Sequence, residues 1–78
     1  MYIKHPEKYF LSKKEELALI YHHRREKNKR IADRLKAILY LHKGFSYEQI
    51  SELLFLEDNT IRNHYERYVS EGIDGLLK

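Results

Sequence analysis

The sequence predicts an all-α fold, a small bundle of four helices within a range of three to five, and three observations support it. The 78-residue chain holds only three glycines and one proline, so few residues interrupt a helix. Charged residues make up 35% of the chain, with Leu, Ile, Lys and Glu favoured, which is typical of helical domains. Apolar residues recur at spacings of three and four in several segments. This length suits one small domain and excludes an enzyme that encloses its substrate between two domains.

The sequence predicts an N-terminal arm over residues 1–11 and a single domain over residues 12–78. We expect the arm to dock onto the domain through Tyr9 and Phe10. Ser12 and Glu15 form a capping box, so the first helix begins at Ser12. Its expected buried stripe consists of Leu17, Ile20 and Tyr21. The charged run 22–30 breaks this pattern, so we expect a bend or turn within it.

A second helix is predicted from about Asn28 to Lys43, followed by Gly44 as its stop. The third helix begins at Ser46, which forms a second capping box with Gln49. The expected buried faces are Ile31, Leu35, Ile38 and Leu39 in the second helix, and Ile50, Leu53 and Leu54 in the third.

The polar cluster 57–60 opens a fourth helix, capped by Glu57 or Asp58 and stopped by Gly72. Its expected buried stripe consists of Ile61, Tyr65, Tyr68 and Val69. We expect residues 73–77 to turn back and cover the core.

The third and fourth helices together predict a helix-turn-helix motif over about residues 46–70. Leu56 plugs the turn and Ile61 anchors the fourth helix across it. Phe55 stands where many such turns carry glycine, so either the turn differs in detail or Phe55 points outward. This geometry leaves the front of the fourth helix free to enter a DNA major groove, whereas the alternative is a plain helical hairpin in a small bundle.

Candidate DNA contacts follow from the chemistry of the exposed side chains. Arginine pairs with guanine, asparagine with adenine, and threonine with phosphate or a thymine methyl. Tyr47 either reaches a phosphate through its hydroxyl or is an exposed ring. The expected base contacts are Asn59, Arg62 and Asn63, and the expected phosphate contacts are Thr60, Arg67, Ser46, Tyr47, Lys43, Arg30, Lys29 and Arg34.

Charge divides the chain into two unequal halves. Residues 1–44 hold 12 Lys/Arg against 5 Asp/Glu, a balance of +7, whereas residues 45–78 hold 3 against 7, a balance of −4. The first half is therefore a candidate surface for a polyanion, with a solvated helix face as the alternative. The acidic second half argues against a strongly attractive DNA-binding helix there.

Several motifs together resemble the N-terminal helix-turn-helix of bacterial insertion-sequence transposases related to the mariner superfamily. The motifs are Phe-Ser-Tyr-Glu-Gln-Ile at 45–50, Leu-Phe-Leu at 54–56, Asp-Asn-Thr-Ile-Arg at 58–62 and Glu-Gly-Ile-Asp-Gly-Leu-Leu at 71–77. The resemblance covers residues 12–78. It implies a homeodomain-like bundle that recognises terminal-inverted-repeat DNA, with Thr60, Arg62 and Arg67 at matching positions. In that family a catalytic domain follows, and since this chain ends at Lys78 we expect no strand-transfer activity.

Enzymatic and metal sites are not expected from the residues present. Cysteine is absent, which excludes thiolate zinc, and the adjacent His22 and His23 point about 100° apart on a helix. We therefore expect no catalytic residue, metal, cofactor or small-molecule substrate. The apolar runs are too short to span a membrane. The expected location is the cytoplasm, at the nucleoid when DNA is bound.

A protein-interaction or dimerisation module without DNA binding is the alternative function. Tyr40 and Leu41 fall off the main face of the second helix and, with Phe55, form a candidate exposed apolar patch. Small domains often gain stability by pairing, so a homodimer is also a hypothesis.

Overall fold

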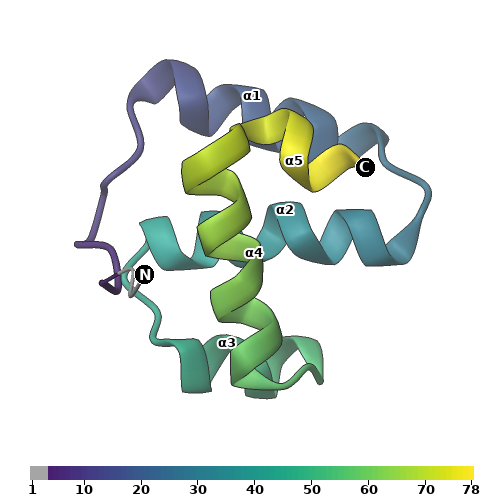
Figure 1. Ribbon diagram of the computed structural model, residues 1–78. Helices are drawn as coiled ribbons and strands as arrows, with labels where there is room; N and C mark the ends of the chain where they lie inside the picture. The colour runs from purple at the N-terminus through teal and green to yellow at the C-terminus, as the bar shows by residue number, and fades with distance from the viewer. Residues whose placement is uncertain (1–3) are drawn as a thin grey trace.

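The computed structural model describes residues 4–78, so the first three residues of the expected arm lie outside the described residues. Five helices and their connecting loops make up the described chain, which contains no strand (Figure 1). This confirms the all-α prediction, with residues 73–77 forming a short fifth helix. The helices are α1 (Lys13–Arg25), α2 (Lys29–His42), α3 (Tyr47–Leu54), α4 (Asp58–Glu71) and α5 (Ile73–Leu77).

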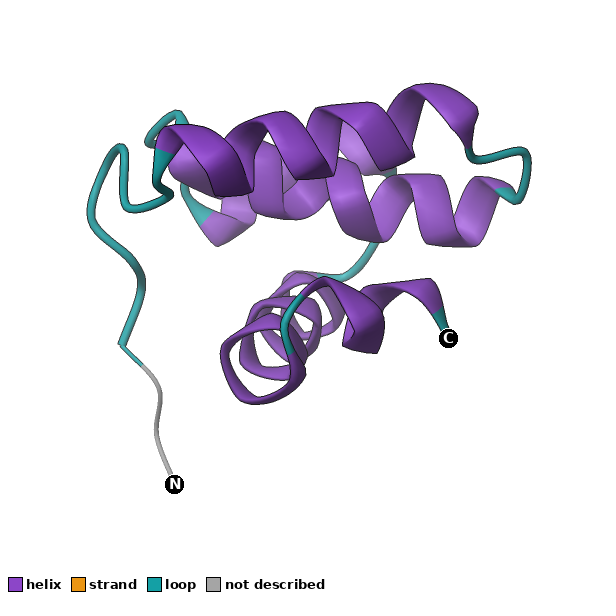
Figure 2. Ribbon diagram, turned by 90° about the horizontal axis from the view of Figure 1, so that it is seen from above, coloured by secondary structure: helices purple, strands orange, loops and turns teal. Residues whose placement is uncertain are grey.

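Helix α2 is the centre of the molecule and packs against each of the other four helices. Figures 1 and 2 show α1 lying alongside α2 as an antiparallel hairpin, while α4 crosses α2 and α5 folds back from the end of α4. The core is the set of buried apolar side chains Leu11, Leu19, Leu35, Ala37, Ile38, Leu41, Tyr47, Ile50, Leu54, Ile61, Tyr65 and Leu76. The core thus draws on all five helices and on the end of the arm.

Both predicted capping boxes are present. The Ser12 hydroxyl oxygen accepts the Glu15 N–H at 3.1 Å, and the Ser12 N–H donates to Glu15 Oε1 at 2.9 Å. Ser46 and Gln49 repeat this arrangement with the same two distances, 3.1 and 2.9 Å. Each box satisfies backbone N–H groups that the first helical turn leaves unpaired, so both helices begin where the sequence predicts.

The end of α2 forms a Schellman motif around Gly44. The Gly44 N–H donates to the Leu41 carbonyl at 3.0 Å, and the Phe45 N–H donates to the Tyr40 carbonyl at 3.1 Å. Gly44 has φ +96°, a conformation that side-chain-bearing residues rarely adopt. The rings of Tyr40 and Phe45 stack 5.2 Å apart, which is the apolar contact that usually accompanies this motif. Gly44 therefore ends α2, as the sequence predicts.

The turn between α3 and α4 places Phe55 in the left-handed conformation, with φ 57°, and leaves its side chain 93% exposed. Of the two alternatives for Phe55, the ring points outward. The next residue, Leu56, packs against the core, as the motif predicts. The Ser51 hydroxyl donates to the Leu56 carbonyl, which holds the turn against α3. Glu57 precedes α4 as its N-cap residue without a side-chain capping bond.

Four predicted core positions are wrong, because Leu17, Tyr21, Leu53 and Val69 are each about half exposed, from 49% to 53%. In α1 the fully buried residue is Leu19. The expected patch of Tyr40, Leu41 and Phe55 is also wrong, since Leu41 is fully buried and Tyr40 packs against the core. The reason is that α2 is surrounded by other helices and buries several of its sides, whereas α1 packs chiefly against α2 and buries few residues.

The arm docks onto the C-terminal end of α2 through His42. The Tyr9 N–H donates to the His42 carbonyl, and the Leu11 N–H donates to His42 Nδ1 at 3.0 Å. Phe10 docks as expected, with its ring edge-on to Tyr65 at 5.7 Å, and Leu11 is buried. Tyr9 stays 64% exposed, although its ring edge contacts His42.

Within the described residues, no helix combines the length and the apolar character that crossing a lipid bilayer requires.

Candidate nucleic-acid interface

The outward face of α4 carries polar side chains. At about 100° per residue, Asn59, Asn63 and Ser70 fall on the side opposite the buried Ile61 and Tyr65, and all three are exposed. Glu66 and Arg67 lie on the edges of the same face. Two of the three predicted base contacts, Asn59 and Asn63, therefore lie where a helix lying in a groove would present them.

Arg62, the third predicted base contact, lies on the α3 side of this face. Its guanidinium carbon is 4.7 Å from the centre of the Tyr47 ring, a cation–π contact with the first residue of α3. The His5 ring meets the same tyrosine edge-on at 4.7 Å. This stack was not predicted, because no local sequence signal connects residues 5, 47 and 62.

Tyr47 requires a correction. The structure buries its side chain, which is 7% exposed, and its hydroxyl oxygen is buried as well. The ring is part of the core, so neither expected alternative holds: the hydroxyl is not presented to a phosphate, and the ring is not exposed. The physical reason is that the arm and α4 cover the start of α3, and neither contact is readable from the position next to the Ser46 cap.

Ser46 and Lys43 are exposed in the connection from α2 to α3, and Ser46 directly precedes Tyr47, the residue that Arg62 contacts. Ser46 uses its hydroxyl oxygen to accept the Gln49 N–H, so its own proton remains able to donate to a phosphate oxygen. Lys43 follows the last residue of α2. With Arg62 they are the candidate phosphate contacts near α3, and we call these three residues the α3-side flank (Lys43, Ser46 and Arg62).

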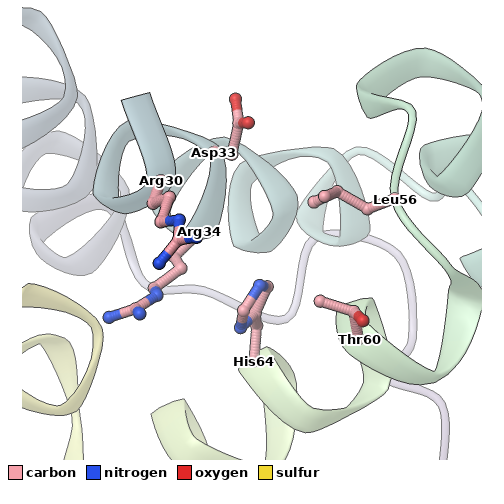
Figure 3. A pocket seen from close by; sticks show the side chains of 6 residues that line it. All are labelled: Arg30, Asp33, Arg34, Leu56, Thr60 and His64. Atoms are coloured by element: carbon pink, nitrogen blue, oxygen red, sulfur yellow. The ribbon is translucent and has the colours of Figure 1, made fainter. Parts of the chain in front are cut away.

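On the other side of α4 lies a cavity of about 260 Å³, which we call the α2–α4 pocket (Figure 3). Arg34 is tied to the C-terminal segment, since its Nη1 donates to the carbonyls of Leu76 and Lys78 at 3.3 and 3.2 Å. Lys29 pairs with Asp33 at 3.3 Å. The pocket is lined by Arg30, Asp33 and Arg34 from α2, Leu56 from the turn, and Thr60 and His64 from α4.

This pocket brings together three of the predicted phosphate contacts, Arg30, Arg34 and Thr60, and adds His64, which was not predicted. The pKa of His64 is lowered to about 4, chiefly by burial and also by the positive charges of Arg34 and Arg67, against which Asp33 raises it less. His64 is therefore neutral at pH 7. The pattern that could have revealed it is the spacing of four between Thr60 and His64, which places both on one side of α4.

Acidic side chains gather at the helix-turn-helix turn. Glu48, Glu52, Glu57 and Asp58 line a shallow depression around Ser51. They account for most of the negative charge of the second half of the chain and lie beside the start of α4. Nowhere in residues 4–78 do three His, Asp or Glu side chains come together in a way that could hold a metal ion.

The chain was compared with known protein families, curated proteins and solved structures. The family model of the homeodomain-like domain matches residues 28–77, which comprise α2 to α5 and the cap of α2. No curated protein and no solved structure matches the chain. The matched segment contains the central helix, the helix-turn-helix pair and the closing helix in the order described above. The chain therefore belongs to the homeodomain-like helix-turn-helix family.

Proposed function

We propose that this chain binds double-stranded DNA with α4 in the major groove. The observation that carries the proposal is the exposed face of Asn59 and Asn63, which lies between two sides that both present groups able to bind phosphate. On one side is the α3-side flank, and on the other is the α2–α4 pocket with its two arginines. A groove-bound helix needs this arrangement, because a phosphate backbone runs along each edge of the groove.

In this proposal, the side chains of α4 recognise the DNA sequence. Asn59 and Asn63 are able to form paired hydrogen bonds with adenine, and Arg62 with the two acceptors of guanine. The Tyr47 ring restricts the orientation of Arg62, so less side-chain entropy is lost when Arg62 binds a base. Arg67, exposed further along α4, is the phosphate contact of this helix in the proposal.

Attraction to DNA comes mainly from outside α4. Lys29, Arg30 and Lys43 are exposed on α2 or directly after it, and they supply the positive charge that α4 itself lacks. Each phosphate neutralised releases condensed counterions, so the affinity should fall steeply as salt increases.

The resemblance to insertion-sequence transposases supports terminal inverted repeats as the class of target. One copy of the chain presents one recognition helix, and single modules of this kind bind weakly. Use as a homodimer or beside a second module would raise the affinity, and light scattering on the free chain and on the complex measures which state binds. The alternative of a protein-interaction module predicts a stable dimer that ignores DNA.

The experiment is a fluorescence-anisotropy titration with a random duplex of about 20–25 bp at about 50 and 200 mM salt, followed by selection of a preferred sequence. We expect binding in the micromolar range that is largely lost at the higher salt. On the selected sequence, Asn63→Ala should lower discrimination against a changed base pair by about 1–3 kcal/mol without altering the salt dependence.

Ser70→Ala is the control on the same side of α4, because Ser70 lies two turns further on and its hydroxyl donates to the carbonyls of Glu66 and Arg67, so the substitution should leave discrimination unchanged. Absence of binding at the lower salt would contradict the proposal. Equal discrimination in the wild type and in Asn63→Ala would remove Asn63 from the reading face.

A further inference from the structure

The α2–α4 pocket is built from two pairs of residues that face each other. Arg30 and Arg34 are four residues apart and share one side of α2, and Thr60 and His64 are four residues apart and share one side of α4. Helix α4 crosses α2, so the two pairs meet where the helices pack. The result is a hollow with guanidinium groups on one wall and a hydroxyl and an imidazole on the other.

The charge of the pocket is positive. Within residues 4–78, Arg30 forms no ion pair with an acidic side chain, and Arg34 uses only Nη1 for its two carbonyl partners. Nε and Nη2 of Arg34 therefore remain able to donate to a ligand. Asp33 is the one carboxylate in the lining, and Figure 3 shows it directed away from His64 and Thr60. The ammonium group of Lys29 also compensates the charge of Asp33, with Nζ 3.3 Å from Oδ2.

We propose that the α2–α4 pocket binds a single phosphate group, held by the guanidinium groups of Arg30 and Arg34 and by hydrogen bonds from Thr60 and His64. Two guanidinium groups match the geometry of phosphate oxygens, and the hydroxyl and the neutral imidazole each supply one further donor. Where the phosphate belongs to a DNA backbone, this inference rests on the proposed function, and it assigns His64 to the DNA contacts. A free phosphate ion offers the same chemistry, so the experiments separate the two sources.

The first experiment titrates inorganic phosphate into the free chain and follows the His64 ring and the Thr60 amide by NMR, with chloride at equal ionic strength as the control. An anion beside His64 stabilises its protonated form, so millimolar phosphate should raise the His64 pKa, which starts at about 4, by about one unit. Arg30→Gln should abolish this response. Unchanged His64 and Thr60 signals in the wild type would overturn the pocket as a phosphate site.

The second experiment measures DNA binding of Arg30→Gln and Thr60→Val. We expect Arg30→Gln to lower the affinity about 3- to 10-fold at low salt and to reduce the slope of log affinity against log salt by about one. Thr60→Val, which keeps the side-chain shape, should lower the affinity about 2- to 5-fold. Lys14→Gln, the same loss of charge at an exposed position of α1, is the matched control and should stay within about twofold of the wild type.

The outcomes separate this inference from the proposed function. If the chain ignores DNA but phosphate shifts His64, the pocket is a site for free phosphate and the proposed function is wrong. If the chain binds DNA, phosphate leaves His64 unchanged and the pocket variants behave like Lys14→Gln, the pocket inference is overturned while the proposed function stands. A phosphate response without any effect of Arg30→Gln on DNA binding restricts the pocket to the free ion.

Discussion

Helices α2 and α4 cross in the middle of the molecule and differ in almost every property. Helix α2 packs against four helices and buries six residues, Asp33 among them, and it carries four Lys/Arg against this one Asp. Helix α4 buries only Ile61 and Tyr65, and it carries two Arg against three acidic residues together with two Asn. In the proposed function, this difference separates two tasks of a DNA-binding domain. The sequence-independent attraction would come from the helix that holds the core together, and the base contacts would come from a nearly neutral helix.

A neutral reading helix has a physical advantage for specificity. Lysine and arginine attract every phosphate equally, so their number raises non-specific binding as much as specific binding. Asparagine gains energy only where a base edge offers the matching donor and acceptor. The division of labour depends on α4 being held in a fixed position on α2, which the following predictions test.

The largest expected effect is on the core contact that fixes α4. Ile61 is fully buried, so Ile61→Ala should lower the free energy of unfolding by about 2–5 kcal/mol, from lost burial and the cavity left behind. Urea denaturation measures this, and Ile61→Val should lose only about 0.5–1.5 kcal/mol. Val69→Ala, at a half-exposed position of the same helix, is the control and should change stability by about 0.5 kcal/mol or less. A loss in Val69→Ala equal to that in Ile61→Ala would contradict the assigned orientation of α4.

A smaller effect is expected where the two helices meet at His64. The unfolded chain takes up a proton at this side chain below about pH 6.5, whereas the folded pKa is about 4. Between these values the unfolded state binds more protons, so stability falls as the pH falls through this window. Between about pH 7 and pH 5, the wild type should therefore lose about 1 kcal/mol more of its free energy of unfolding than His64→Gln loses. This figure allows for the partial exposure of the ring.

Urea denaturation at each pH gives the slope of unfolding free energy against pH for the wild type and for His64→Gln. Comparing these two slopes is independent of what the substitution does to stability at pH 7. The lowered pKa values of Glu15, through its bonds to Ser12, and of Glu71, through its bond to Lys78, add further losses only near or below their usual value of 4.5. Identical pH slopes for the wild type and His64→Gln would show that His64 is not desolvated between α2 and α4.

The smallest expected effect concerns the turn that leads into α4. Phe55 has a left-handed backbone and an almost fully exposed ring, so Phe55→Gly should raise the free energy of unfolding by about 0.5–1 kcal/mol. Thermal and urea denaturation measure this change. Leu53→Gly, two residues earlier at a helical position, is the control and should be destabilising by about 1 kcal/mol or more. A destabilised Phe55→Gly would mean that the ring makes a contact that outweighs the backbone strain.

Sequence patterns predicted local features well and burial less well. The capping boxes at Ser12 and Ser46 and the stop at Gly44 depend on groups within a few residues of one another, and all three are present. Leu53 and Val69 fit a helical apolar spacing, yet about half of each side chain stays exposed. Tyr47 illustrates the opposite error, since distant segments bury a residue that looks like a surface position next to a cap.

The sequence by itself determined where α1 to α4 begin, where α2 and α4 stop and that α3 and α4 form a helix-turn-helix, because capping, turns and apolar spacing act over three to five residues. Only the tertiary structure decided which sides of those helices are buried, because burial depends on how many neighbours each helix has. It also brought Arg30 and Arg34 to face Thr60 and His64, about thirty residues further along the chain. The reason is geometric: the crossing of α2 and α4 is set by packing of the whole core, and no local pattern encodes that crossing.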